Sequence, residues 1–263
     1  MSGETCDIDF RVRAHELGTA SCARLPVLLG YLQEAAAVHA RSLGFSHEEM
    51  SASNLFWVLT RLYLRLSPEA VARRWPGWRE KVAVRTWPVC FERLQARRDF
   101  LILDEQGRTM GAAVSSWVTL DTAARRLSSM PEELRRRIPV RDEHALEYPG
   151  RKTPGLQPVA DGQGEGLLMT AQRSDLDVNG HVNNAVLVAW ALDEAATHLP
   201  LEARCTALEV AFRAEVLPGQ SVLAKSAPQG EGLRLLGLFS AEDGREHLRA
   251  VSWWETAQAG DRP

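Results

Sequence analysis

Several features are scarce in this chain, and each scarcity excludes a class of protein. No segment approaches the roughly 18 uninterrupted apolar residues of a membrane-spanning helix, so no span is expected. The formal net charge is only −3, which argues against a nucleic-acid binder that works by bulk attraction to phosphates. The segment Met1–Asp7 is acidic and has no apolar core. Neither a secretory signal nor a transit peptide is recognised there, and we expect the cytosol.

Cysteine is scarce as well. The four cysteines are widely spaced and form no C-x-x-C pair: Cys6, Cys22, Cys90 and Cys205. Such spacing favours neither a metal site nor a disulfide framework, so we expect free thiols, no metal and no cofactor. Hydrophobic residues at 45% and charged residues at 25% are the balance of a soluble globular protein. With 263 residues, the chain has room for one large domain or two ordinary ones.

The chain contains an internal repeat. Leu32-Gln-Glu-Ala-Ala36 recurs 160 residues later as Leu192-Asp-Glu-Ala-Ala196. The pattern Gly107-Arg, Ala-Val-Ser, Trp117 recurs as Gly244-Arg, Ala-Val-Ser, Trp254. Because two matches fall in the same order, they indicate a duplication.

Each copy begins with a helix and continues with strands. In the first copy Pro26 suits a first helical turn, apolar residues follow at helical spacing, and Gly44 ends the helix. In the second copy residues 185–192 are apolar all round, which predicts a fully buried helix. We expect these helices at residues 25–43 and 183–199. Alternating, β-rich segments predict strands at residues 55–66, 80–88, 98–103, 112–120, 206–216, 221–227, 233–240 and 248–255.

A segment rich in proline and glycine separates the copies. Residues 139–166 contain four prolines and five glycines, a composition typical of a surface linker. We therefore expect domains at residues 1–138 and 167–263.

The most informative stretch precedes the second helix. Within eight residues the chain places five hydrogen-bonding side chains: Asp177, Asn179, His181, Asn183 and Asn184. A helix N-terminus offers unpaired N–H groups and a partial positive charge, which stabilise a developing oxyanion. An acid, an amide and an imidazole beside such a site suit hydrolysis of an activated carbonyl. A plain helix cap is the alternative interpretation.

The stretch Asp177-Val-Asn-Gly-His-Val-Asn-Asn184 resembles the D-x-N-x-H-V-N-N signature of acyl-ACP thioesterases. Weaker matches are Leu32–Ala36 with His39, Leu43-Gly44, Phe56-Trp57-Val-Leu59, Thr86-Trp87-Pro88 and Glu92-Arg93. The resemblance covers about residues 8–130 and 165–256. It implies an α+β fold, a tandem (double) hotdog in which two long central helices are each wrapped by an antiparallel β-sheet. It also implies hydrolysis of fatty acyl-ACP thioesters.

The resemblance assigns a catalytic network to Asp177, Asn179 and His181. It adds Glu215, near the end of the strand predicted at residues 206–216, as the base or the group that positions water. A surface ion pair with Arg213 is the alternative for that carboxylate. Asp175 is expected to be an ordinary loop carboxylate.

Plant members often carry Cys directly after this Glu, but this chain has Val216. Cys205 lies ten positions before Glu215, about 33 Å away if the segment is extended. A thiol nucleophile is therefore excluded, which leaves direct attack by water or a transient acyl-Asp177.

At the 160-residue spacing, the catalytic positions fall opposite Leu17, Thr19 and Ser21, which have no equivalent chemistry. We therefore expect one active site per chain, with the first copy as scaffold and acyl-chain holder. Phe56 and Trp57 are candidates to line an acyl tunnel, although aromatic residues in strands also serve as plain core. Asn183 and Asn184 are candidate substrate-binding residues.

The implied partner is an acidic acyl carrier protein bearing an acyl-phosphopantetheine. Basic residues near the linker are a candidate docking surface: Arg125-Arg126, Arg135–Arg137, Arg141 and Arg151-Lys152. A solvated helix face at residues 131–138 is the alternative. Other functions left open are an acyl-CoA or polyketide-carrier thioesterase and a non-catalytic acyl-binding hotdog module. Chain length and oligomeric state stay open, with a homodimer as one option.

Overall fold

The computed structural model describes residues 4–92, 94–124, 126–156 and 166–255. Arg93 and Arg125, which the sequence analysis named, lie outside these residues. The chain divides into two compact units. The first comprises Met1–Leu17, Ser21–Ala23 and Leu28–Pro149, and the second comprises Gly18–Ala20, Arg24–Val27 and Gly150–Pro263.

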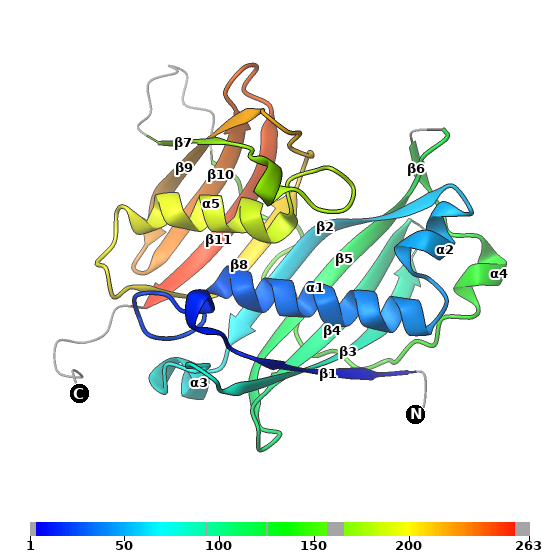
Figure 1. The fold of residues 1–263 in the computed structure, drawn as a ribbon, viewed down its shortest axis with the longest axis horizontal. Coiled ribbons are helices and arrows are strands. Elements are labelled where there is room, and N and C mark those ends of the chain that lie inside the picture. The colour runs from blue at the N-terminus through cyan, green and yellow to red at the C-terminus, as the bar shows by residue number, and fades with distance from the viewer. Residues whose placement is uncertain (1–3, 93, 125, 157–165, 256–263) are drawn as a thin grey trace. The chain divides into compact units, whose positions relative to one another are not determined.

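The first unit contains an antiparallel sheet in the order β1-β3-β4-β5-β2, and the short strand β6 pairs with β5. Its strands are β1 (Cys6–Arg11), β2 (Leu55–Leu66), β3 (Lys81–Glu92), β4 (Gln95–Leu103), β5 (Thr109–Asp121) and β6 (Arg126–Ser128). Its helices are α1 (Leu25–Ser42, of which the part from Leu28 belongs to this unit), α2 (His47–Ser51), α3 (Pro68–Ala72), α4 (Glu132–Arg135) and the 3₁₀ turn η1 (Ala14–Glu16). Helix α1 lies against one face of this sheet (Figure 1).

Helix α1 forms where the apolar spacing predicts it. Leu28, Leu32 and Ala35, on one helical face, are all buried. The helix ends where Gly44 adopts a left-handed φ of 77°, and Phe45 N–H then bonds back to the Ala40 carbonyl at 2.8 Å. Glycine occupies this conformation without strain, so the end of the helix is fixed by the sequence.

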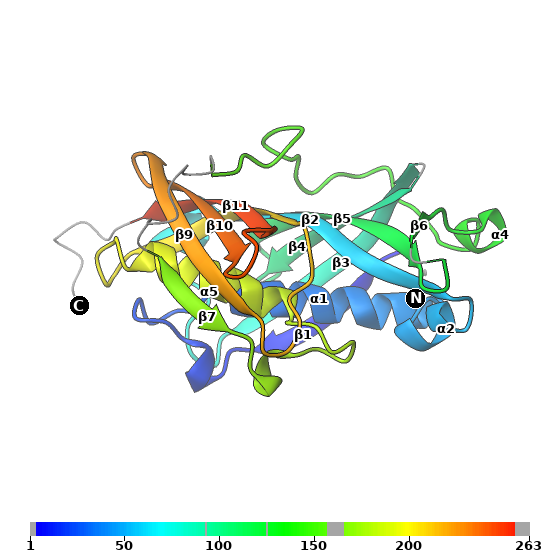
Figure 2. The same ribbon diagram turned by 90° about the horizontal axis from the view of Figure 1, so that it is seen from above.

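The second unit repeats this plan. Helix α5 (Asn184–Ala196) contacts a sheet in the order β8-β11-β10-β9-β7 (Figure 2). The strands are β7 (Leu167–Thr170), β8 (Arg204–Phe212), β9 (Ser221–Gly230), β10 (Leu233–Ser240) and β11 (Glu246–Glu255), and the 3₁₀ turn η2 (Arg173–Asp175) precedes α5. Each unit is thus a helix against an antiparallel sheet.

Helix α5 differs from its prediction in two respects. It ends at Ala196, and residues 197–199 form turns. It is also not buried all round, because Leu187, Val188 and Ala191 are buried while Trp190 keeps partial exposure. The apolar stretch at residues 185–192 therefore predicted the helix correctly, but the prediction that it is fully buried was wrong.

Three strands were missed: β1, β7 and the short β6. β1 and β7 each precede the helix of their copy and pair with β3 and β9 respectively. In β1 exposed and partly buried residues alternate, which is the period of a half-buried strand. That signal was present in the sequence Cys6-Asp-Ile-Asp-Phe-Arg11.

The described part of the segment between the copies is hydrogen-bonded to the sheets of the two units. In the first unit Trp87 Nε1 donates to the Glu143 carbonyl at 2.8 Å, and Ala145 N–H donates to Asp99 Oδ2 at 2.8 Å. In the second unit the buried Thr153 hydroxyl donates to Glu209 at 2.6 Å. The boundaries 1–138, 139–166 and 167–263 stay a prediction, and residues 157–165 lie outside the described part.

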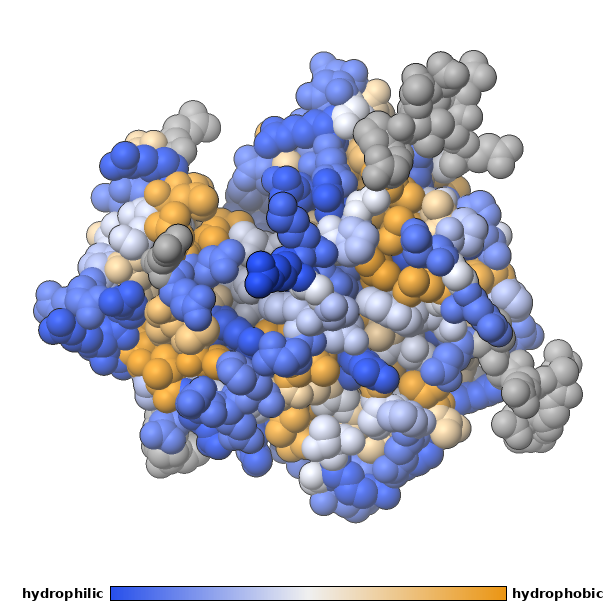
Figure 3. All heavy atoms as spheres, turned by 180° about the vertical axis from the view of Figure 1, so that it is seen from behind, coloured by the Kyte–Doolittle hydropathy of each residue, from blue (hydrophilic) through white to orange (hydrophobic). Residues whose placement is uncertain are grey.

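Within the described residues, no helix is long and apolar enough to cross a bilayer. On the face shown in Figure 3, hydrophilic residues are interspersed with small apolar patches.

Candidate active site

The polar motif forms a closed loop between η2 and α5. Leu176 and Val182 pair as a β-bridge, and Asp177 N–H donates to the His181 carbonyl at 2.8 Å. Gly180, at the turn, has a φ of 77°, which a residue with a side chain adopts at a cost. The loop therefore places the side chains from 177 to 181 at one end of α5.

The Asp177 carboxylate organises this loop. Its Oδ1 accepts the backbone N–H groups of Asn179 at 2.8 Å and His181 at 3.2 Å. Its Oδ2 accepts Asn179 Nδ2 at 3.2 Å. The carboxylate thus accepts three hydrogen bonds, which fix the side-chain amide of Asn179 and the backbone at Asn179 and His181.

The structure brings His181 and Glu215 together across 34 residues of sequence. His181 Nε2 lies 3.3 Å from Glu215 Oε2. The two side chains are 35% and 60% exposed, so water has access to both.

Backbone hydrogen bonds hold the Glu215 segment on both sides. Before it, the N–H groups of Arg213 and Ala214 donate to the His247 carbonyl at 2.8 and 3.2 Å. After it, Val182 N–H donates to the Val216 carbonyl at 2.9 Å. The motif loop is thereby joined to the segment that follows β8, which sets the distance between imidazole and carboxylate. The strand predicted to run to residue 216 ends at Phe212, so Glu215 lies three residues beyond it.

The remaining polar residues have structural partners. Asn183 Oδ1 accepts Ala185 N–H at 2.8 Å and so caps α5, while Asn184 is the first residue of the helix. Asp175 Oδ2 accepts Gln172 N–H at 2.8 Å, in keeping with an ordinary loop carboxylate. A role for Asn183 and Asn184 in substrate binding stays a prediction.

The alternative partner for Glu215 is engaged elsewhere. Arg213 Nε lies 3.8 Å from Glu246 Oε2, so its guanidinium pairs with that carboxylate. Glu215 faces His181 instead.

Phe56 and Trp57 lie on β2 of the first unit. Phe56 contacts His47 edge to face, with ring centroids 5.6 Å apart. Trp57 packs against a buried cluster that includes Phe45 and Met50. Both residues therefore have packing partners within this unit, and their role in holding an acyl chain stays a prediction.

The first copy contains the same loop without the same chemistry. Leu17 and Ala23 form the bridge that Leu176 and Val182 form in the second copy, an offset of 159 residues. The loops correspond further, because Ala23 N–H donates to the Pro76 carbonyl at 2.8 Å as Val182 N–H donates to Val216.

This offset corrects the expected correspondence by one residue. The counterparts of Asp177, Asn179, His181 and Glu215 are Gly18, Ala20, Cys22 and Trp75. Leu17, Thr19 and Ser21 were therefore the wrong counterparts, although the first copy still lacks an acid–base set. Ser21 corresponds to Gly180 and shares its left-handed backbone, with a φ of 58°.

Both halves of the chain match known protein families. Residues 3–138 match the family described as the acyl-ACP thioesterase N-terminal domain, and residues 160–256 match its C-terminal domain. The chain belongs to the acyl-ACP thioesterase family.

Curated relatives come from plants. The chain is 31% identical over 268 residues to a chloroplastic acyl-[acyl-carrier-protein] hydrolase from Cuphea viscosissima, covering 96% of this chain and 63% of the relative. It is 31% identical over 271 residues to a chloroplastic palmitoyl-acyl carrier protein thioesterase from Gossypium hirsutum, covering 95% and 64%. The chain thus spans less than two thirds of the length of these relatives.

Solved structures of the family show the same architecture. The 12:0-ACP thioesterase from Umbellularia californica matches with a TM-score of 0.81 at 26% identity, covering 96% of this chain and 98% of that one. An acyl-ACP thioesterase from Bacteroides thetaiotaomicron matches with a TM-score of 0.80 at 25% identity, covering 97% and 100%. The expected tandem hotdog fold is confirmed.

The cysteines are spread over both units of the structure. All four are free thiols. Burial in β8 raises the pKa of Cys205 to about 12, and burial also raises the pKa of Cys6 and Cys90. A raised pKa leaves little thiolate near neutral pH, so these thiols are poor nucleophiles.

No metal centre is present in the part of the chain that the structure describes: no group of three or more His, Cys, Asp or Glu side chains is arranged to hold an ion.

Proposed function

We propose that this chain hydrolyses fatty acyl-ACP thioesters to a free fatty acid and holo-ACP. The observation that carries the proposal is the approach of His181 Nε2 to within 3.3 Å of Glu215 Oε2, beside the N-terminus of α5. Family membership supports the thioester substrate, and the names of the relatives support the carrier.

In the proposed reaction, His181 and Glu215 activate a water molecule as a general base pair. The water loses a proton to this pair while its oxygen bonds to the thioester carbonyl carbon. The carbonyl oxygen becomes an oxyanion, the C–S bond then breaks, and the proton passes to the departing thiolate. A positioned base of this kind contributes about 10²–10⁴ in rate.

Asn179 is the proposed donor to the oxyanion. Its amide carries two hydrogens, and the hydrogen bond to Asp177 Oδ2 uses one of them. The second hydrogen and the partial positive charge of the α5 N-terminus stabilise the negative oxygen in this scheme.

Direct attack by water is favoured over a transient acyl-Asp177. Both oxygens of the Asp177 carboxylate accept hydrogen bonds from the loop, three in all. To attack a carbonyl, the carboxylate would have to give up hydrogen bonds that hold Asn179 and His181. We therefore assign Asp177 to positioning.

We assign the acyl chain to the first unit. The first copy of the repeat, to which most of this unit belongs, has Gly18, Ala20, Cys22 and Trp75 where the second copy has the proposed acid–base set, so it retains the fold without the chemistry. Acyl-CoA and polyketide-carrier thioesters remain the alternative substrates.

The test is hydrolysis of matched acyl-ACP and acyl-CoA panels by purified protein, with His181→Ala and Glu215→Gln as variants. We expect the acyl-ACPs to have the higher kcat/KM, and each variant to lose about 10²–10⁴ in turnover. The matched control is His198→Ala, because His198 Nε2 also lies 3.0 Å from a carboxylate, Glu194 Oε1, outside the motif. Preference for acyl-CoA would overturn the carrier assignment, and full activity in both variants would overturn the site.

A further inference from the structure

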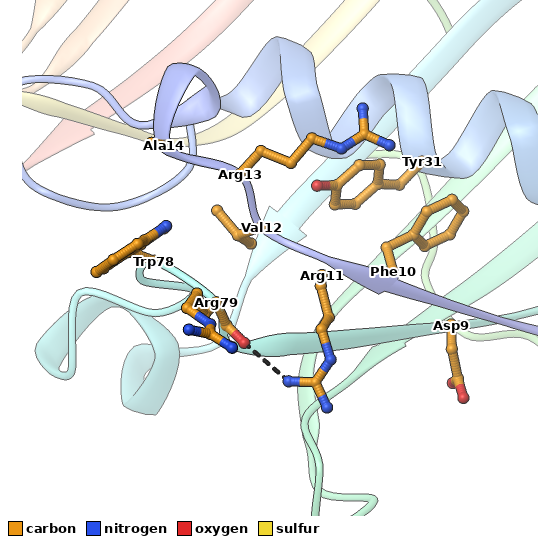
Figure 4. Close-up of a pocket in the computed structure, with 9 residues that line it drawn as sticks. All are labelled: Asp9, Phe10, Arg11, Val12, Arg13, Ala14, Tyr31, Trp78 and Arg79. Atoms are coloured by element: carbon orange, nitrogen blue, oxygen red, sulfur yellow. Dashed lines mark hydrogen bonds between the residues drawn. The ribbon is translucent and has the colours of Figure 1, made fainter.

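A groove of about 590 Å³ lies in the first unit, along the end of β1 (Figure 4). Helix α1 and the segment just before β3 supply its other walls. The reaction scheme above uses none of its residues.

The floor of the groove is apolar and rigid. Phe10 and Tyr31 stack in parallel, with ring centroids 4.3 Å apart. Val12, beside them, is buried. The Tyr31 hydroxyl donates to Glu16 Oε2 at 2.7 Å, which fixes the ring from its polar end.

The rim is positively charged. It carries Arg11, Arg13 and Arg79. Arg11 Nη1 donates to the Arg79 carbonyl at 3.2 Å, and the structure pairs neither guanidinium with a carboxylate among the residues it describes. Arg13 is largely exposed and approaches Glu16 only to 3.9 Å.

The charge of Asp9 at the groove is already balanced, because Asp9 Oδ2 lies 2.9 Å from Lys81 Nζ.

Arg79 has a φ of 62°, a left-handed conformation that costs a non-glycine residue free energy. Glycine would adopt the backbone conformation of residue 79 with less strain, yet this position of the rim is an arginine.

An exposed tryptophan stands at one end of the groove. Trp78 is 62% exposed, and no other aromatic residue is among the large exposed apolar side chains of the described chain. In Figure 4 it lies at the opposite end from Phe10 and Tyr31, with Val12 and Arg13 between them. Tryptophan and arginine are the residues that most often dominate the binding energy of protein interfaces.

The basic residues near the linker are less suited to bind a partner. Arg135 and Arg136 both pair with Glu132, and Arg141 pairs with Glu143. These carboxylates lower the local positive charge, so the solvated-face interpretation suits this segment better. Among the described residues, Arg11 and Arg79 of the groove have no such carboxylate partner, and Arg13 approaches Glu16 only to 3.9 Å.

We propose that the groove docks an acidic protein surface, that of the carrier that delivers the thioester. This inference rests on the proposed function. Carboxylates of the carrier meet Arg11, Arg13 and Arg79, and an apolar side chain of the carrier enters above Phe10 and Tyr31. Charge complementarity of this kind speeds association and selects the partner.

The test is a charge reversal, Arg11→Glu with Arg79→Glu, read with two substrates. One is an acyl-ACP, and the other is the same acyl group on N-acetylcysteamine, which has no carrier protein. We expect KM for acyl-ACP to rise about tenfold or more and to lose its dependence on salt, while kcat/KM for the small thioester stays unchanged. The matched control is Arg135→Glu with Arg136→Glu, which we expect to leave both substrates unaffected.

Three outcomes would overturn the docking surface: an unchanged KM for acyl-ACP in the groove variant, an equal loss with the small thioester, or a rise in KM in the control variant alone. Acyl-CoA provides a further arm, because an equal rise in its KM would show that the groove binds nucleotide phosphates instead.

Direct binding of holo-ACP separates this inference from the proposed function. If the wild-type protein binds holo-ACP through the groove but hydrolyses no acyl-ACP, the function fails and the docking surface stands. If it hydrolyses acyl-ACP while the groove variant binds holo-ACP with unchanged affinity, the docking surface fails and the function stands. Trp78→Ala, which alters no charge, should also weaken this binding.

Discussion

Replacing His181 by Ala should separate activity from stability. The His181–Glu215 pair is 3.3 Å apart and its side chains are 35% and 60% exposed. Exposed pairs of this kind contribute about 0–1 kcal/mol to folding, so the variant should unfold almost where the wild type does. Its turnover should fall by about 10²–10⁴, which is roughly 3–5 kcal/mol in the activation barrier.

His198→Ala should have the opposite effect, lowering the free energy of unfolding while leaving turnover unchanged. His198 contacts Glu194, whose side chain is buried and whose Oε2 already has no hydrogen-bond partner in the structure. Loss of the imidazole removes a hydrogen-bond partner from the buried Glu194 carboxylate, which should lower the free energy of unfolding by about 1–3 kcal/mol. Turnover should stay close to that of the wild type because this pair lies outside the motif.

The assay combines urea unfolding with steady-state hydrolysis of one acyl-ACP by each variant. The reasoning would be refuted if His181→Ala lost several kcal/mol of stability, since its low activity would then reflect unfolding. It would equally be refuted if His198→Ala lost activity as severely while remaining folded.

Further predictions concern the cysteines, the cap of α5 and the sheet of the first unit. Replacing all four cysteines by Ser should leave turnover largely intact apart from a packing cost, and loss of turnover in a folded variant would support a thiol mechanism instead. In the wild type, the free energy of unfolding should fall as pH rises above about 8.5, because the Cys205 thiol ionises there in the unfolded chain, whereas in the folded protein its pKa is about 12. Asn183→Ala removes the cap of α5 and should lower the unfolding free energy by about 1 kcal/mol in urea titrations, whereas Asn183→Asp should retain most of it. Enlarging small side chains within residues 55–62 should shorten the preferred acyl chain, since overfilling an apolar site costs about 1–3 kcal/mol, and a shift only from matched changes within residues 206–212 would contradict the division of labour.

The sequence predicted the duplication and both helices because apolar periodicity is a local property. The correspondence between the copies was wrong by one residue at the loops. Matching at Leu32 and Leu192 implies an offset of 160, whereas the bridges at Leu17 and Leu176 show 159. Helices α1 and α5 begin at Leu25 and Asn184, which is again an offset of 159. The loops and the starts of the helices therefore agree on the correspondence, and the match at Leu32 is one residue out of step with it.

The site was predicted unevenly for a similar reason. Asp177 to His181 form a contiguous motif, so their proximity could be inferred. The approach of Glu215 to His181 depends on the register of β8 and on hydrogen bonds to Val216, which spacing does not encode. The groove was missed altogether, because Arg11 and Arg79 come from separate segments and each resembles an ordinary surface arginine.

Trp75 stands where the second copy has Glu215, and this difference limits what the first copy can become. The indole is 2% exposed, and Cys22, the counterpart of His181, is 2% exposed as well. Placing an acid at residue 75 would empty a large volume, at a cost of about 3–5 kcal/mol, and would also bury a carboxylate. A domain of ordinary stability, about 5–15 kcal/mol, has little margin for such a change. A single substitution is therefore not enough to give the first copy an acid–base pair, because the surrounding core would have to be repacked at the same time.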